Sequence, residues 1–158
     1  MRAFPAALLV IGLLASAAQA ELLNGPAAAL DGRTIAIAGE AIRLLDIDAP
    51  DPGQACRDAT GADYPCGERA RAALAEILDG GPVACDWAVR DADGLKLARC
   101  MLGNADVARR MLELGWAVPA RDCKCETYRD AAQRAEASRR GLWQGGFAMP
   151  WDWRTPSP

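Results

Sequence analysis

Apolar and polar residues alternate along four short stretches of the chain, as they do in half-buried β-strands. The first pair covers residues 34–38 (TIAIA) and 41–47 (AIRLLDI), with a short glycine-containing connection between them. The second pair covers residues 82–90 and 95–102, which are joined by a turn at 91–94. Because a short turn between alternating stretches is typical of antiparallel pairing, the pattern predicts two β-hairpins.

Three later stretches carry apolar residues at the spacing of an amphipathic helix. They cover residues 67–79, 105–114 and 126–140, and a glycine follows each of them. This spacing gives a helix one face to bury, and glycine is common just beyond a helix end. Residues 51–65 are rich in Gly, Asp and Pro, so we expect a loop there.

The C-terminal tail, residues 144–158, is rich in aromatic residues and proline. Four aromatic side chains lie in it or beside it: Trp143, Phe147, Trp151 and Trp153. We expect them to fold back and cover the core. Left exposed, they would form an apolar patch large enough to mark an interaction site.

The first 20 residues have the composition of a Sec-type signal peptide. Arg2 precedes an apolar run that ends at Ala18, and Ala18-Gln19-Ala20 forms an A-x-A cleavage site. The run is short for a membrane span of roughly 20 residues, although an uncleaved anchor is the alternative. The sequence therefore predicts a mature chain that begins at Glu21, lacks a membrane span and is periplasmic or secreted.

All six cysteines lie after the predicted cleavage site: Cys56, Cys66, Cys85, Cys100, Cys123 and Cys125. An even number in an exported chain favours disulfides. A zinc site is the alternative, but the chain has no histidine and no CxxC pair. We prefer the pair Cys56–Cys66, which flanks the loop at 51–65, and the pair Cys85–Cys100, which lies on the facing strands of one hairpin. The partners of Cys123 and Cys125 stay open.

The charge of the chain disfavours strong binding of nucleic acid, although a local arginine surface would allow some. The formal net charge is −3, and it becomes −4 once the first twenty residues, with Arg2, are removed. The absence of histidine also excludes histidine-based triads, general bases and metal ligands. Chemistry in this chain would have to use carboxylates, arginine, lysine or tyrosine.

Residues 42–51 (IRLLDIDAPD) combine a buried-strand pattern with one arginine and three carboxylates. Asp46 and Asp48 are two positions apart and therefore share one face of the predicted strand. Such carboxylates need a cation, a donor or water, because an unpaired buried charge costs several kcal/mol or is neutralised. The partners of Asp48 and Asp51 are therefore the central question for the function of this chain.

Six segments, in order and with matching spacing, resemble the staphylococcal nuclease (thermonuclease) family over about residues 25–143. They are GPAAALDGRT (25–34), IRLLDIDAPD (42–51), CGERARAAL (66–74), DADGLKLARC (91–100), ADVARRMLELGWAV (105–118) and SRRGLWQGGF (138–147). The resemblance implies an α+β, mainly β fold for residues 21–143, an OB-type five-stranded barrel with three helices. The WDWR sequence at 151–154 is similar to the tail of exported bacterial members.

Members of this family hydrolyse DNA and RNA phosphodiesters with one calcium ion, and the resemblance assigns roles to four residues. Arg43 matches the first phosphate-binding arginine. Asp48 matches a calcium ligand, and Ala49 supplies the backbone carbonyl that helps to bind the ion. Asp51 stands where the family has the glutamate that positions the attacking water, which shortens its reach by one methylene.

Besides Asp51, two positions depart from the family pattern. Asp31 and Thr34 match the outer residues of the DGDT segment, but the metal-binding Asp between them is Arg33 here. Leu95 replaces the second phosphate-binding arginine; the adjacent Lys96 faces the other way on a strand. We hypothesise that the guanidinium of Arg33 replaces the ion and pairs with Asp48, and with Asp46 or Asp51 as well.

These departures predict an exported thermonuclease-like protein in which catalysis is weakened or lost. Calcium would be the cofactor if the site is active, and otherwise there would be none. The first alternative is an active phosphodiesterase in which Asp31 and Asp46 replace the missing ligand and Arg57 supplies the second arginine. The second alternative is a non-catalytic OB-fold binding module.

Overall fold

The computed structural model describes residues 21–155. The predicted signal peptide lies outside these residues. Within them, no helix is both long enough and apolar enough to cross a membrane.

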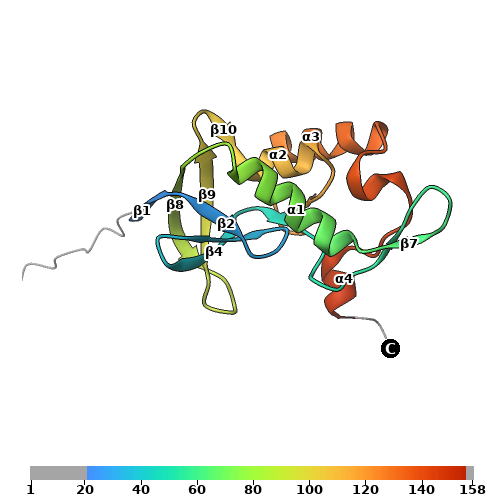
Figure 1. The fold of residues 1–158 in the computed structure, drawn as a ribbon, viewed down its shortest axis with the longest axis horizontal. Coiled ribbons are helices and arrows are strands. Elements are labelled where there is room, and N and C mark those ends of the chain that lie inside the picture. Colours follow the sequence, from blue (N-terminus) through green and yellow to red (C-terminus); the bar gives the residue numbers. More distant parts are fainter. Residues whose placement is uncertain (1–20, 156–158) are drawn as a thin grey trace, which may run out of the picture.

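A mainly antiparallel, seven-stranded sheet forms one side of the molecule (Figure 1). The strands are β1 (Glu21–Gly25), β2 (Ala27–Ala29), β3 (Thr34–Ile37), β4 (Glu40–Leu44), β5 (Ile47–Asp48), β6 (Cys56–Arg57), β7 (Asp63–Tyr64), β8 (Val83–Arg90), β9 (Lys96–Leu102), β10 (Ala105–Asp106) and β11 (Val118–Pro119). The main sheet runs in the order β1-β8-β9-β4-β3-β2, with β10 paired to β9. The fold is therefore mixed α+β and mainly β, as expected for the OB type, but the barrel is not closed within the described residues.

Both predicted hairpins are confirmed. β3 pairs with β4 so that Thr34 faces Arg43, and β8 pairs with β9 so that Cys85 faces Cys100. β4 and β9 run parallel, which brings the two hairpins side by side. The strand predicted over residues 41–47 is wrong at its end: β4 stops at Leu44, because Asp46 turns the chain with a φ of 65°.

The three predicted helices are present as α1 (Cys66–Leu78), α2 (Val107–Glu113) and α3 (Glu126–Ala137). Figure 1 shows α1 lying across the sheet, with α2 and α3 together beyond it. Residues 105–106, expected to be helical, form β10 instead, and the Asp106 side chain accepts the backbone N–H of Arg109 at the start of α2. A 3₁₀ turn, Gly141–Gln144, and a fourth helix, α4 (Pro150–Arg154), follow α3 and were not predicted.

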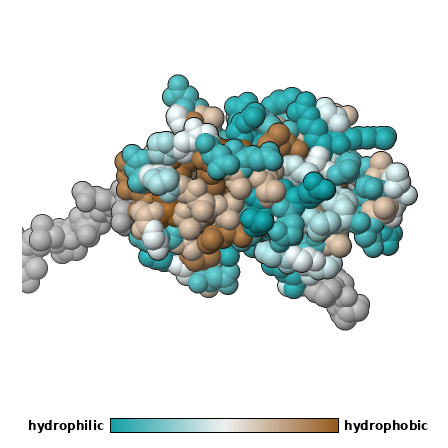
Figure 2. Space-filling view, viewed as in Figure 1, coloured by the Kyte–Doolittle hydropathy of each residue, from teal (hydrophilic) through white to brown (hydrophobic). Residues whose placement is uncertain are grey.

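The main core lies between the sheet and α1, α2 and α3. Its fully buried side chains include Ile35, Ile42, Leu44, Leu74 and Met111. Hydrophobic residues remain exposed at the end of the sheet where β1 begins, while hydrophilic residues predominate over the helices (Figure 2). Burial of the apolar faces of these helices is what holds them on the sheet.

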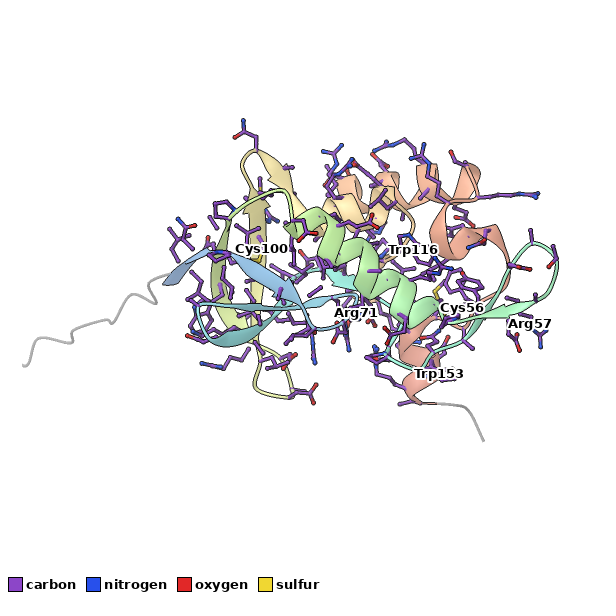
Figure 3. All side chains as sticks on the ribbon, in the orientation of Figure 1. Cys56, Arg57, Arg71, Cys100, Trp116 and Trp153 are labelled. Atoms are coloured by element: carbon purple, nitrogen blue, oxygen red, sulfur yellow. A yellow bond between two sulfur atoms is a disulfide. The ribbon has the colours of Figure 1, made fainter. Side chains whose placement is uncertain are left out.

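The aromatic tail folds back, as expected, onto a second and smaller cluster. This cluster is built on Cys56, Cys66, Val118 and Leu142, with Tyr64, Trp116, Trp143, Phe147, Met149 and Trp151 packed against it (Figure 3). The rings of Trp143 and Phe147 pack edge to face, with their centroids 5.1 Å apart. Trp153 is the exception, because 44% of its surface is exposed.

The six cysteines form three disulfides. Cys56–Cys66 and Cys85–Cys100 pair as predicted, and Cys123 pairs with Cys125. The first disulfide ties the loop after β5 to the start of α1, which is the surface that the tail covers. Disulfides of this number are typical of proteins outside the cytoplasm.

One of the contacts between that loop and the tail is a buried side-chain amide, which predicts how firmly the tail is held. Gln54 is fully buried, and its Nε2 donates to the carbonyl oxygen of Ala148 at 2.8 Å. We expect Gln54→Ala to lower the free energy of unfolding by about 1–2 kcal/mol, because the Ala148 carbonyl loses its donor. The variant should also lose its tail faster in limited proteolysis. The exposed α3 residue Gln133, replaced by Ala, is the matched control, and equal behaviour of the two variants would contradict the prediction.

Candidate functional site

Arg33 is held by the tight turn that precedes β3. One carboxylate oxygen of Asp31 accepts the backbone N–H groups of Arg33 and Thr34 at 2.8 and 2.7 Å. Gly32 allows this turn to sit against α1, because a Cβ there would lie 2.8 Å from that of Ala70. The turn therefore fixes the backbone from which the Arg33 side chain extends.

Asp48 and Asp51 lie just beyond β4, on the short strand β5 and the loop after it. β5 pairs with β11, and the Asp48 side chain is 8% exposed. Its Oδ1 accepts the backbone N–H of Ala49 at 2.9 Å. Gly67 lets the backbone of Asp51 pack directly on α1, because a Cβ at position 67 would lie 2.0 Å from the Asp51 carbonyl oxygen. Close packing of the loop on α1 therefore sets the spacing of the two carboxylates.

Arg33 reaches both carboxylates. Its Nη1 lies 3.0 Å from Oδ1 of Asp48, and its Nη2 lies 3.7 Å from Oδ1 of Asp51. The ion pair predicted between Arg33 and Asp48 is therefore present, and Asp51 is the second partner. The predicted alternative partner, Asp46, is not one of the carboxylates that Arg33 contacts.

A second arginine, Arg154 at the end of α4, reaches the same two carboxylates from the other end of the chain. Its Nη1 donates to Oδ2 of Asp51 at 2.8 Å and to Oδ1 of Asp48 at 3.3 Å, and its Nη2 donates to Oδ2 of Asp48. Partial burial lowers the pKa of Arg154, but the hydrogen bonds to Asp48 and Asp51 raise it by more. The Arg154 guanidinium is thus permanently charged.

Arg33, Arg154, Asp48 and Asp51 form one neutral cluster, which we call the arginine–aspartate cluster. Each of the four carboxylate oxygens faces a guanidinium nitrogen. Calcium needs about six to eight oxygen ligands and is repelled by nearby cations. The residues present do not fit a calcium ion, because two guanidinium groups already occupy the positions from which it would be bound.

The sequence matches the family described as "Staphylococcal nuclease homologue" over residues 41–145. The chain belongs to the staphylococcal nuclease family. It is also 36% identical to the succinoglycan biosynthesis protein ExoI of Rhizobium meliloti (strain 1021) over 145 residues, which cover 90% of this chain and 76% of that protein. It is 32% identical to the protein ParB of Escherichia coli over an alignment of 170 positions, which covers 96% of this chain and 90% of ParB.

Arg43, which matches the first phosphate-binding arginine of the staphylococcal nuclease family, is turned toward a different set of carboxylates. Its Nη1 contacts Asp91 and lies 3.0 Å from Oδ2 of Asp93, both in the turn between β8 and β9. Leu95, in the position of the second family arginine, follows the same turn. Lys96 is buried, pairs with Glu40 at 2.6 Å and lies over the Trp87 ring, so it does not replace that arginine.

The structure does not place the suggested replacement residues at Asp48. Both backbone hydrogen bonds of the Asp31 side chain hold its own turn. The carboxylate of Asp46 lies beside Cys123 and Cys125 instead. Arg57 pairs with Asp63 at 3.6 Å on the exposed loop (Figure 3). None of the described contacts of Asp48 therefore comes from these three residues, and their part in an active site stays a prediction.

Sequence analysis missed Arg154, although the WDWR segment that contains it was noted. The signal was available in principle: an arginine beside the tail aromatics, in a chain with two carboxylates that lack their family cation. Three contacts bring it into place: Gln54 with Ala148, and Arg121 with Asp152 at 3.3 Å and with the Trp151 ring at 5.3 Å.

Proposed function

We propose that this chain is an exported staphylococcal nuclease homologue in which two arginines replace calcium and phosphodiester hydrolysis is lost or severely weakened. One observation carries the proposal: Asp48 and Asp51 are each paired with both Arg33 and Arg154. The family's calcium would polarise the phosphate and the attacking water if it were bound. Within the described part of the chain, Asp48 and Asp51 offer neither a free ligand set nor a free carboxylate for that water.

The remaining charges of the site support the same proposal. Asp51 is the residue that would have to position water, and its two oxygens already face Arg33 and Arg154. Arg43 would have to stabilise charge that develops on the phosphate, but Asp91 and Asp93 neutralise it. Loss of one transition-state donor typically lowers the rate by about 10²–10³-fold. Here the metal ligand and the second family arginine are replaced, and the first, Arg43, is already paired with carboxylates.

The proposed location is the periplasm or the medium. It rests on the signal-peptide pattern at residues 1–20, which would make Glu21 the first residue of the mature chain, and on the three disulfides. We propose nucleic acid as a weak ligand at most, because the mature chain would carry a net charge of −4.

A nuclease assay with single-stranded DNA and RNA, run with calcium and with a chelator, tests the proposal. We expect hydrolysis at least ~10³-fold slower than by staphylococcal nuclease assayed alongside, with no difference between calcium and chelator. Calcium-dependent cleavage at a comparable rate would contradict the proposal. Binding without cleavage that falls steeply with salt would identify a nucleic-acid binding protein that has lost its chemistry.

A further inference from the structure

A group of side chains that could hold a metal ion shares no residue with the arginine–aspartate cluster. Among residues 21–155, Asp46, Cys123 and Cys125 form a group whose carboxylate oxygen and two sulfur atoms lie within 4.8 Å of one another. Cys123 is nearly buried, whereas Asp46 and Cys125 are half-buried. None of the three takes part in the contacts that hold Asp48 or Asp51.

The backbone holds each of these three residues in place. Asp46 sits in the left-handed turn after β4, and its carbonyl oxygen accepts the N–H of Ala120 at 2.9 Å. The N–H of Cys123 donates to the carbonyl oxygen of Ala120 at 3.0 Å. One residue, Ala120, thus links the turn that presents the carboxylate to the segment that presents the sulfurs.

Cys125 is the residue immediately before α3, a helix of 12 residues. Its carbonyl oxygen accepts the N–H groups of Tyr128 and Arg129, both at 3.2 Å, and its own N–H points at the sulfur of Cys123 at 3.3 Å. The guanidinium of Arg129 donates to the carbonyl oxygen of Cys123. A helix N-terminus and a nearby arginine both favour thiolates over thiols.

The Cys123–Cys125 disulfide is the one we expect to be reduced first. Its cysteines are 2 positions apart in sequence, whereas those of the other two disulfides are 10 and 15 positions apart. A short loop gains least from the entropy that a disulfide removes from the unfolded chain. The other four cysteines are buried, whereas Cys125 is half-buried and accessible to a reductant.

We propose that Cys123, Cys125 and Asp46 form a redox-controlled site for a thiophilic divalent cation such as zinc. A thiol reductant, protein or small molecule, would break the S–S bond, and two electrons and two protons pass to the pair while the reductant becomes a disulfide. Zinc binding then releases both thiol protons, and the ion is held by two thiolates and the Asp46 carboxylate, with water as the fourth ligand.

This arrangement explains why a zinc site was disfavoured by sequence spacing alone. The CKC segment supplies only two sulfurs, and they are too close in sequence to dominate a tetrahedral set. The fold adds a third anionic ligand from a turn nearly eighty positions earlier in the chain. In the oxidised protein the two sulfurs are bonded to each other and cannot bind zinc. Zinc binding would therefore require reduction of this disulfide.

The test uses the full mature chain, oxidised or mildly reduced with a phosphine, and zinc titrated in competition with a chromogenic chelator. Mass spectrometry after alkylation should first show free thiols at Cys123 and Cys125 only. We expect one zinc per reduced chain and none per oxidised chain. Asp46→Asn should weaken binding at least ~10-fold. Asparagine tolerates the left-handed backbone of position 46, so this variant should keep its fold.

Two further variants complete the test. Asp122→Asn removes an exposed carboxylate next to the pair but outside the group, and it should bind zinc as the natural chain does. Cys123→Ser/Cys125→Ser should bind none. Equal zinc binding by oxidised and reduced chains, no binding by the reduced chain, or an Asp46→Asn variant with unchanged affinity would each overturn the proposal. So would reduction of the buried disulfides before Cys123–Cys125.

Discussion

The double variant Arg33→Asp/Arg154→Ala is expected to bind calcium, whereas the residues of the natural site do not fit this ion. Two guanidinium groups neutralise Asp48 and Asp51 in the natural chain. The double variant removes both cations and adds a third carboxylate at the position where the staphylococcal nuclease family has its ligand. Isothermal titration calorimetry should detect a dissociation constant on the order of 10⁻⁴–10⁻³ M, the range of extracellular calcium modules.

The single variants separate the two arginines. Arg33→Asp alone should bind calcium much more weakly than the double variant, because Arg154 still contacts both carboxylates. The exposed pair Arg57→Asp/Arg71→Ala changes the net charge by the same amount away from the cluster and should gain no binding. Absence of calcium binding in a folded double variant would show that the arginines are not what excludes the ion. Equal binding by the Arg57/Arg71 control would attribute the gain to net charge.

Asp48→Ala is expected to destabilise the protein by about 2–3 kcal/mol, because it leaves two arginines without a buried partner. This is below the roughly 3–5 kcal/mol that follows from breaking a fully buried pair. We expect a smaller destabilisation because the Arg154 side chain is 33% exposed and because Asp51 remains as a partner for both arginines. Urea unfolding followed by tryptophan fluorescence measures the change.

A matched control exists on the loop after β5. Asp63 forms an ion pair with Arg57 in which both side chains are more than two-thirds exposed, 77% and 73%. Asp63→Ala should change the stability by no more than about 0.5 kcal/mol. If Asp48→Ala were as mild as this control, the arginine–aspartate cluster would contribute little to folding, and its arginines would be placed by the Asp31 turn and by the tail.

Local sequence predicted most of the elements that surround the site. The alternation at 34–38 and the spacing at 67–79 appear in the structure as β3 and α1, within a residue or so at each end. These patterns are local, since a strand or helix depends on residues within a few positions of each other. The two disulfides Cys56–Cys66 and Cys85–Cys100 could be predicted because each closes a short loop or one hairpin.

The predictions that failed concern side-chain direction at turns. Asp46 and Asp48 would share a face on a regular strand, but the left-handed backbone at Asp46 breaks the alternation and sends the two carboxylates to different clusters. The hairpin turn between β8 and β9 presents Asp91 and Asp93 to Arg43, which the sequence pattern did not indicate, and the phosphate-binding role of Arg43 stays a prediction. No periodicity in the sequence encodes either outcome.

The sequence was enough to identify the family, the order of the two hairpins and three helices, and the exchange of an expected calcium ligand for Arg33. The cations that balance Asp48 and Asp51, by contrast, depend on the tertiary fold. Arg154 lies 106 positions after Asp48, and its place depends on how the chain leaves α3, packs its aromatic residues on the Cys56–Cys66 loop and begins α4. A contact of that range follows from the packing of the whole tail, so it becomes visible only when the chain has folded.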